Sequence, residues 1–146
     1  MQIVSRSAIV PYSAKEMYTL VNDIQAYPHF LPWCTGAKVL HQTPTEITAS
    51  LEIHKGGISK SFTTRNILGE HHIDMHLVDG PFKSLEGRWE FHPLADQGCK
   101  VAFQLAFEFT NRVMQMMLGA TFNHAANTLL TAFCERAKHL HHAHAH

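Results

Sequence analysis

The chain has 146 residues, of which 45% are hydrophobic and 16% are charged, so it is long enough for one hydrophobic core and short for two. Its 12 basic and 12 acidic residues balance, and because the lysines and arginines are scattered rather than clustered, we expect no direct DNA binding. The three cysteines stand at unrelated spacings, which predicts neither a disulfide framework nor a paired-cysteine metal site.

The N-terminal segment predicts a strand rather than a targeting signal. It lacks the charged leader and apolar core of a secretion signal, and no stretch of the chain approaches the roughly 20 apolar residues that span a bilayer. We therefore expect a cytoplasmic protein. Residues 2–10 are rich in β-branched side chains and stop at Pro11, which is typical of an edge strand.

Two short helical segments are expected next. Ser13 and Glu16 form a capping box, and the apolar residues that follow recur at helical spacing. The segment YPHFLPWC, residues 27–34, combines two prolines with aromatic side chains that need burial. It therefore predicts short turns that act as a lid over the core.

Residues 36–111 follow a period of two, the pattern of half-buried strands. The alternation is clearest over 47–53, 73–77 and 101–109, and turn signals with glycine or proline separate the runs. Together with the first strand, this predicts about seven strands in a mostly antiparallel sheet. Phe82 has the opposite parity to Leu85, which indicates either a β-bulge or a different packing layer for Phe82.

A long C-terminal helix is predicted from Asn111 to about Lys138, because this stretch has no proline and a single glycine. Its apolar face near period 3.6 consists of Leu118, Phe122, Ala125, Leu129 and Phe133. Residues 139–146 are histidine-rich and of low complexity, and we expect them to be a disordered tail outside a domain formed by residues 1–138.

The expected elements differ in width, and this difference predicts a cavity. Seven strands at about 4.8 Å spacing make a sheet on the order of 30 Å wide, whereas a helix with its side chains is about 10 to 12 Å thick. The sheet must therefore curl around the helix, and the remaining volume becomes either aromatic core or a pocket. We predict an α+β fold whose curved sheet and long helix enclose an apolar cavity for a hydrophobic ligand.

Several stretches of sequence carry a family resemblance. VPYS, MYxLVxDIxxYPxFLPWC, GGISKSFTTRN, LVDGPFKSLEGRWEF and CKVAFQLAFEF span most of the chain from about Ile3 to Lys138. With them the chain resembles the family that contains the coenzyme Q-binding proteins and the bacterial ribosome association toxin RatA. The resemblance implies a START-like helix-grip fold. It also implies ubiquinone or a similar polyisoprenoid lipid as bound ligand, in support of respiratory electron transport, with transient contact at the inner-membrane surface.

Two alternative functions come with the same resemblance. A ribosome association toxin would bind the large ribosomal subunit and block subunit joining, and related helix-grip proteins include polyketide cyclases and dehydratases. An enzyme of that kind needs a general acid or base inside the pocket. The inward faces offer none, and His124 on the long helix is the nearest candidate, so we expect a binding protein with no catalytic residue.

The candidate ligand-binding residues are large inward-facing side chains of the lid, the sheet and the long helix. The indole N–H of Trp33 and the amide of Asn66 are donors suited to a quinone carbonyl, and Asn66 shares the inward parity of Phe62. Core packing remains the alternative role for each apolar residue. The full set is Phe30, Leu31, Trp33, Phe62, Asn66, Met75, Leu77, Phe82, Phe107, Phe109, Met114, Met117 and Phe122.

The sequence predicts no metal site and no cofactor apart from the lipid ligand. His72, Asp74 and His76 form a row on one strand face, but that face is opposite the apolar one and points to solvent.

Overall fold

The computed structural model describes residues 1–95 and 97–144, and for residues 55 and 142–144 it describes the backbone only. Along this described chain, strands dominate the first three quarters and a long helix forms the last quarter. The elements are β1 (Gln2–Val10), α1 (Ala14–Asn22), the 3-10 helix η1 (Ile24–His29), β2 (Cys34–Gln42), β3 (Glu46–Lys55), β4 (Ile58–Leu68), β5 (His72–Asp79), β6 (Phe82–Pro93), β7 (Cys99–Phe109) and α2 (Arg112–His144).

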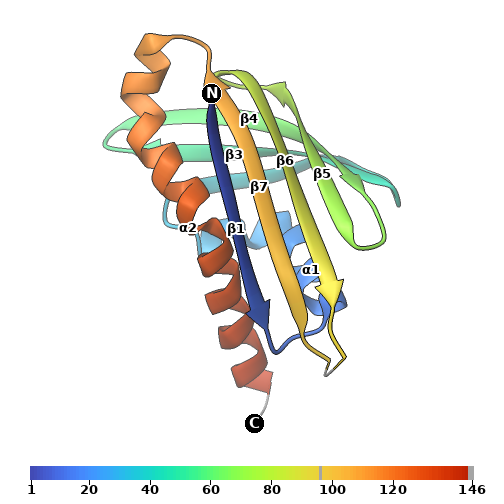
Figure 1. Ribbon diagram of the computed structural model, residues 1–146. Helices are drawn as coiled ribbons and strands as arrows, with labels where there is room; N and C mark the ends of the chain where they lie inside the picture. Colours follow the sequence, from blue (N-terminus) through green and yellow to red (C-terminus); the bar gives the residue numbers. More distant parts are fainter. Residues whose placement is uncertain (96, 145–146) are drawn as a thin grey trace.

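The strands form one antiparallel sheet in the order β1-β7-β6-β5-β4-β3-β2. Consecutive strands from β2 to β7 are neighbours, so hairpins build most of the sheet, and only the pairing of β1 with β7 is distant in sequence. The sheet curls strongly: β3 and β4 run across the direction of β1 and β7, and α2 lies beside β1 along the length of the sheet (Figure 1). This is the helix-grip architecture that the sequence predicted.

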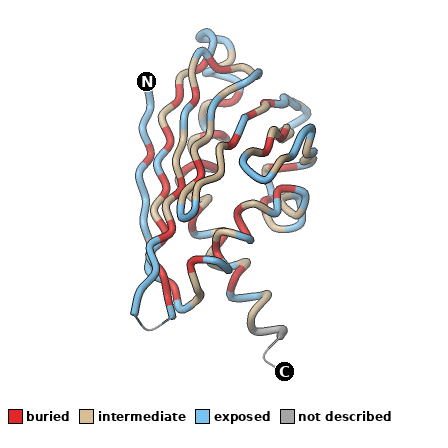
Figure 2. The backbone as a smooth tube through the Cα atoms, turned by 90° about the vertical axis from the view of Figure 1, so that its right-hand side faces the viewer, coloured by how far each residue is buried: buried red, intermediate tan, exposed pale blue. Residues whose placement is uncertain are grey.

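The strand parity also follows the prediction. The five apolar residues of β7 from Val101 to Phe109 are buried, and the residues between them are half-buried or exposed (Figure 2). Phe82 and Leu85 are both buried despite their opposite parity, because the register between β6 and β7 shifts between Phe82 and Ser84. A β-bulge inserts one extra residue there, and it turns both side chains to the inside.

The capping box at α1 is present as predicted. The Ser13 hydroxyl accepts a hydrogen bond from the Glu16 backbone N–H at 3.0 Å, and the Glu16 carboxylate accepts one from the Ser13 backbone N–H at 3.1 Å. Met17, Leu20 and Val21 then bury one face of the helix. η1 follows directly, with Pro28 inside it and Ile24 buried.

α2 begins as predicted but ends later than the sequence indicated. The Asn111 side chain accepts a hydrogen bond from the Met114 backbone N–H at 2.9 Å and so caps the helix. The expected end near Lys138 is wrong, because the helix continues to His144. Leu140 packs against the core, and the His141 ring stacks on Tyr12 with ring centroids 4.7 Å apart.

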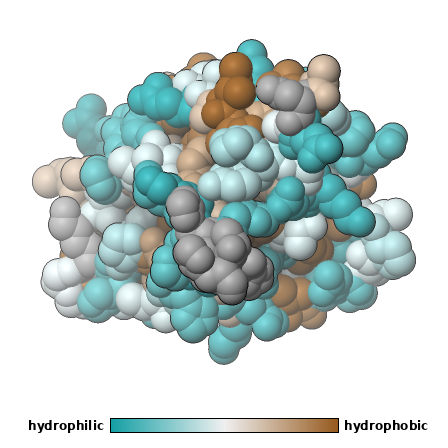
Figure 3. Space-filling model, turned by 90° about the horizontal axis from the view of Figure 1, so that it is seen from below, coloured by the Kyte–Doolittle hydropathy of each residue, from teal (hydrophilic) through white to brown (hydrophobic). Residues whose placement is uncertain are grey.

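The expected disordered tail is therefore corrected to helix over residues 139–144, while residues 145 and 146 lie outside the described residues. Around this end of α2, the surface seen from below is mainly hydrophilic, with smaller hydrophobic patches (Figure 3). No helix of the described residues combines the length and the apolar character needed to cross a membrane.

The buried face of α2 differs from the prediction at one position. Leu118, Phe122, Ala125 and Phe133 are buried as expected. Leu129 is half-buried, however, and Leu130 takes the fully buried place. Leu129 instead borders the cavity described next.

Candidate functional site

An apolar cavity of about 80 Å³ lies between the curled sheet and α2. Its walls come from five strands, from α2 and from the segment that precedes β2. The apolar lining consists of Ala49, Leu51, Phe62, Met75, Leu85, Trp89, Phe103 and Leu105 of the sheet, Phe122, Ala125, Ala126 and Leu129 of α2, and Ile24, Tyr27 and Trp33 near η1. Thr64 and Asn66 complete the lining, so the polar contribution comes mainly from one strand, β4.

Thr64 and Asn66 form a buried polar pair inside this apolar wall. Both residues are less than a tenth exposed, and the Thr64 hydroxyl donates to the Asn66 side-chain oxygen at 3.0 Å. Among the described residues, the Asn66 amide nitrogen has no hydrogen-bond acceptor. This nitrogen is not among the fully buried atoms that lack a partner, and because Asn66 lines the cavity, a carbonyl group there would supply an acceptor.

The parity of β4 is as predicted. Asn66 points inward with Phe62, and the intervening Arg65 points outward to the Glu46 carboxylate, 2.7 Å away. Arg65 therefore takes no part in the cavity.

The predicted lid covers one side of the cavity through η1. The rings of Tyr27 and Phe30 pack edge-on against Phe133 of α2, with centroids 5.3 and 5.4 Å apart. The guanidinium of Arg136 lies 5.2 Å from the Phe30 ring centroid, a cation–π contact that holds the lid to α2. The Tyr27 hydroxyl donates to the Val21 carbonyl oxygen, and burial raises the pKa of Tyr27, so its phenol stays neutral.

The structure brings together five of the thirteen predicted ligand-binding residues. Trp33, Phe62, Asn66, Met75 and Phe122 all line the cavity. They come from three elements, β4, β5 and α2, and from the segment before β2, and the curl of the sheet is what makes them neighbours.

Three predicted residues fill the space instead of lining it. Phe82, Phe107 and Phe109 form an aromatic cluster with Phe62 and Phe122, with ring centroids 4.7 to 6.3 Å apart. Phe107 has no exposed surface at all. This part of the grip is core, because large rings on both sides meet across it.

The other predicted residues lie outside the lining for different reasons. Leu31 is a lid residue that is 1% exposed, and Phe30 and Leu77 are half-buried beside the core. Met114 packs against the core from the first turn of α2. Met117 is 38% exposed, since it is turned about 100° around the helix from the buried Leu118.

The lining residues outside the predicted set are of two kinds. The large ones are Ile24, Tyr27, Leu51, Leu85, Trp89, Phe103, Leu105 and Leu129, and the small ones are Ala49, Thr64, Ala125 and Ala126. Ala49, Ala125 and Ala126 leave room because their side chains are short, and Thr64 lies between Phe62 and Asn66 on the same face of β4. The available signal was the inward parity of these positions together with their small size. Side-chain size alone does not separate the cavity from the filled part of the grip, because the large rings of Trp89 and Phe103 also line the cavity.

The described lining carries one titratable side chain, the Tyr27 phenol. Among the described residues, it contains no carboxylate, imidazole, thiol or ammonium group. His124, the nearest catalytic candidate in the sequence, is exposed on α2 and does not line the cavity. The geometry therefore suits an apolar guest with one or two carbonyl acceptors.

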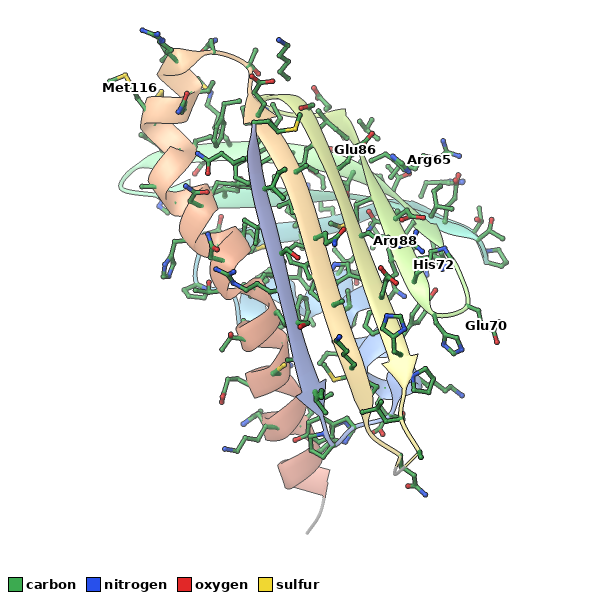
Figure 4. All side chains as sticks on the ribbon, viewed as in Figure 1. Arg65, Glu70, His72, Glu86, Arg88 and Met116 are labelled. Atoms are coloured by element: carbon green, nitrogen blue, oxygen red, sulfur yellow. The ribbon has the colours of Figure 1, made fainter. Side chains whose placement is uncertain are left out.

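The histidine row of β5 lies on the outer face of the sheet, as predicted. His72 points outward together with Arg65, Glu86 and Arg88 (Figure 4). Asp74 is engaged by the Arg88 guanidinium at 2.7 Å, so an ion-pair network occupies this face. Within residues 1–95 and 97–144, no group of three side chains is arranged to hold a metal ion.

Comparison with known proteins shows the family to which this chain belongs. Residues 10–134 match the family model described as polyketide cyclase / dehydrase and lipid transport. The ribosome association toxin RatA of Escherichia coli is 50% identical over 141 residues, which cover 96% of this chain and 89% of that protein. The chain belongs to the RatA family, within the polyketide cyclase / dehydrase and lipid transport family.

Two further similarities mark the range of this larger family. The protein named coenzyme Q-binding protein COQ10 homolog B, mitochondrial, from Xenopus laevis is 27% identical over 138 residues, covering 91% of this chain and 57% of that protein. The crystal structure of a Streptomyces aromatase/cyclase named Zhui has a TM-score of 0.81 at 16% identity, covering 94% of this chain and 93% of the other. At that identity the second similarity shows the shared fold alone.

Proposed function

We propose that this RatA-family protein binds a polyisoprenoid quinone, of which ubiquinone is the model, in the cavity between the sheet and α2. The observation that carries the proposal is the apolar cavity in which Asn66 presents an unpaired amide donor. A quinone offers carbonyl acceptors on an otherwise apolar ring. The similarity to a protein named as coenzyme Q-binding supports the same ligand class.

The size of the cavity adds a requirement to this proposal. At about 80 Å³, the cavity is smaller than the roughly 150 Å³ in which an engineered apolar cavity binds benzene. A quinone ring therefore enters only if the walls move. Trp33, Met75 and Leu129 are half-buried lining residues, and outward rotation of these three side chains enlarges the cavity at the least packing cost.

The two parts of the ligand would contribute differently. Burial of a few hundred Å² of isoprenoid tail gains on the order of 10 kcal/mol gross at about 25 cal/mol per Å², from which association and ordering costs subtract several kcal/mol. A hydrogen bond from Asn66 to the headgroup adds roughly 1 kcal/mol net. Affinity therefore comes from the tail, and orientation comes from β4.

Tryptophan fluorescence tests this proposal directly. The chain has two tryptophans, Trp33 and Trp89, and both line the cavity. Titration of delipidated protein with a short-chain ubiquinone should quench this fluorescence in a saturable way. The control variant Ala126→Leu, which fills the cavity from α2, should lose the saturable quenching and keep its circular dichroism. Folded protein that shows no saturable quenching would contradict the proposal.

A second function, association with the ribosome, is favoured by a separate observation. Relatives named ribosome association toxin are 50% identical to this chain in Escherichia coli and 43% identical in Pseudomonas aeruginosa. We propose that the protein binds the large ribosomal subunit. Because basic and acidic residues balance at 12 each, we expect contacts that depend only weakly on salt rather than a phosphate-dominated interface.

Sedimentation separates the two functions. Purified protein mixed with large subunits at near-stoichiometric amounts should co-sediment in a sucrose gradient at physiological salt and should retain most of its binding when the salt is doubled. Ala126→Leu should bind the subunit like the parent protein, because its change lies inside the cavity. Absence of co-sedimentation would contradict the ribosome proposal and leave the quinone titration unaffected.

A further inference from the structure

The two edges of the sheet are built differently. At the β2 edge, the register with β3 shifts twice, between Cys34 and Gly36 and between Val39 and His41, and η1 packs against the strand. Bulges and covering segments are common ways in which proteins block further strand pairing at an edge. The β2 edge is therefore protected.

The β1 edge has no bulge, and the element beside it is α2, which leaves a groove along the strand. β1 pairs with β7 without a register shift over nine consecutive residues, from Gln2 opposite Phe107 to Val10 opposite Cys99. It contains no proline, and it lies at the free side of the sheet, where most of its residues are exposed (Figures 1 and 2). In the described part of the chain, no strand pairs with its outer side. Alternate backbone groups of β1 thus point outward without a ladder partner.

The side chains of β1 present a different chemistry on each face. On the outer face, Ile3 and Ile9 are each 74% exposed. On the inner face, Arg6 reaches α2, where its guanidinium donates to the Asn127 side-chain oxygen at 2.6 Å and to the Ser5 carbonyl at 3.2 Å. Beside Arg6, a groove between β1 and α2 is lined by Ala8, Leu130 and Cys134, among others.

Arg6 is a cation without a carboxylate partner among the described residues. Its hydrogen bonds go to an amide oxygen and a backbone carbonyl. Other exposed arginines of the sheet have a carboxylate: Arg65 pairs with Glu46, and Arg88 pairs with Asp74. Asn127 holds the Arg6 guanidinium in place over the groove, at the centre of the free strand. The group that would pair with this charge is a carboxylate beside the centre of β1.

We propose that β1 is a docking edge for an extended segment of a partner protein, which pairs with it as an additional strand and carries a carboxylate opposite Arg6. Apolar residues three positions before and after the carboxylate would lie on the outer face, opposite Ile3 and Ile9. The motif is thus apolar-x-x-acidic-x-x-apolar. Backbone hydrogen bonds would supply affinity and the Arg6 ion pair would set the register. The edge is separate from the cavity, so the proposal stands whether or not a quinone binds.

A second copy of the chain fits this edge less well than an acidic segment. Antiparallel pairing of two β1 strands would place Ile3 of each copy opposite Ile9 of the other when the pairing is centred on Arg6. In that register the two Arg6 side chains face each other, and like charges directly opposite are destabilising. The register that best buries the isoleucines therefore excludes a like partner.

The test uses a fluorescein-labelled synthetic peptide with aspartate at its centre, valine and threonine alternating around it, isoleucine three positions to either side and lysine at both ends. Fluorescence anisotropy should show binding to the full-length protein, at least about tenfold tighter than for the same peptide with a central lysine. Arg6→Glu should reverse this preference, so that the lysine peptide binds more tightly. Thermal unfolding of the variant, which should match the parent protein, controls for folding.

Two N-methylated versions of the aspartate peptide test strand pairing itself. Methyl groups on one alternate set of backbone nitrogens block the side that faces β1, and methyl groups on the other set face away. One version should therefore lose binding and the other should keep it. NMR shift changes should be confined to β1 and to residues 127–134 of α2.

Several results would overturn the proposal. These are no peptide binding at millimolar concentration, equal affinity for the aspartate and lysine peptides, equal binding of both N-methylated peptides, and shift changes away from β1. A dimer of the free protein, seen by sedimentation and abolished by N-methyl peptide or by Arg6→Glu, would assign the edge to a second copy and would also overturn it.

Discussion

The space between the sheet and α2 has two regions, one filled by aromatic side chains and one that contains the cavity. Around Phe122 of α2, the rings of Phe82, Phe107 and Phe109 pack together, and none of these three lines the cavity. One helical turn further along, Ala125 and Ala126 face the sheet, and the cavity opens there. The same helix and the same sheet thus form both a filled region and a hollow one.

Small side chains at a few positions, and not a different backbone architecture, set this difference. A sheet that curls around one helix leaves space between the two along its whole length. Near Phe122, phenylalanine side chains from the sheet and from α2 fill that space. Alanines on α2 and Ala49 on β3 are too small to fill it. The comparison teaches that the filled region serves stability, because its packing is complete, whereas the hollow region keeps volume available for a guest.

Removal of a ring from the filled region should have the largest effect. Phe107→Ala deletes a fully buried side chain, and we expect it to lower the free energy of unfolding by about 3 to 5 kcal/mol. Chemical denaturation monitored by circular dichroism measures this. Leu129→Ala at the half-buried rim of the cavity is the matched control and should cost about half as much or less. Equal costs would mean that the two regions are packed alike.

Addition of volume should separate the regions in the other direction. Ala137→Leu adds atoms at a fully buried position of α2 that does not line the cavity, and we expect a loss of about 1 to 3 kcal/mol from overpacking. Ala126→Leu adds the same atoms next to the cavity and should cost less than about 1 kcal/mol. Denaturation midpoints of the two variants measure this difference in stability. If Ala126→Leu is the more destabilising change, there is no spare volume next to Ala126.

The fold was predictable because its signals repeat along the chain. The period of two in β3, β5 and β7 and the capping box of Ser13 each specify a local structure that the tertiary contacts keep. The later end of α2 was not predictable from periodicity. It depends on Leu140 packing against the core and on His141 stacking over Tyr12, and neither contact can be seen before the fold is known.

The site was predictable only in part, for a physical reason. Parity predicts which face of a strand points inward, as it did for Phe62 and Asn66, but it does not predict how far two facing side chains are from each other. Phe82 and Phe107 point inward and meet other rings, whereas Trp33 and Met75 point inward and meet open space. The β-bulge next to Phe82 shows the same limit, since a single inserted residue changes the face of everything before it.

Removal of the polar pair should affect the hollow region without filling it. Asn66→Leu replaces the amide donor with an apolar side chain of similar size, so we expect quinone affinity to fall by about fivefold, the equivalent of one hydrogen bond of about 1 kcal/mol. The free energy of unfolding should fall by about 1 to 3 kcal/mol, because the buried Thr64 hydroxyl loses its partner. The double variant Thr64→Val/Asn66→Leu should recover that stability and leave the affinity low. Unchanged affinity in the fluorescence titration would remove Asn66 from the proposed site.

The smallest effect is expected from a change that touches neither region. The Ser13 backbone N–H and its hydroxyl, followed by the nearby His141, lower the pKa of Glu16 despite some desolvation. A carboxylate whose pKa is lower in the folded state contributes stability above its unfolded pKa, and that contribution disappears as the pH falls through the folded pKa. Glu16→Gln should therefore reduce the melting temperature slightly at neutral pH, by the equivalent of roughly 0.3 to 1 kcal/mol, and the difference from the parent protein should vanish in acid.

Quinone affinity at neutral pH should not change, because Glu16 lies outside the cavity lining. A loss of affinity in Glu16→Gln would show that small global destabilisation alone weakens binding, and the effects assigned to Ala126 and Asn66 would then need to be corrected for it.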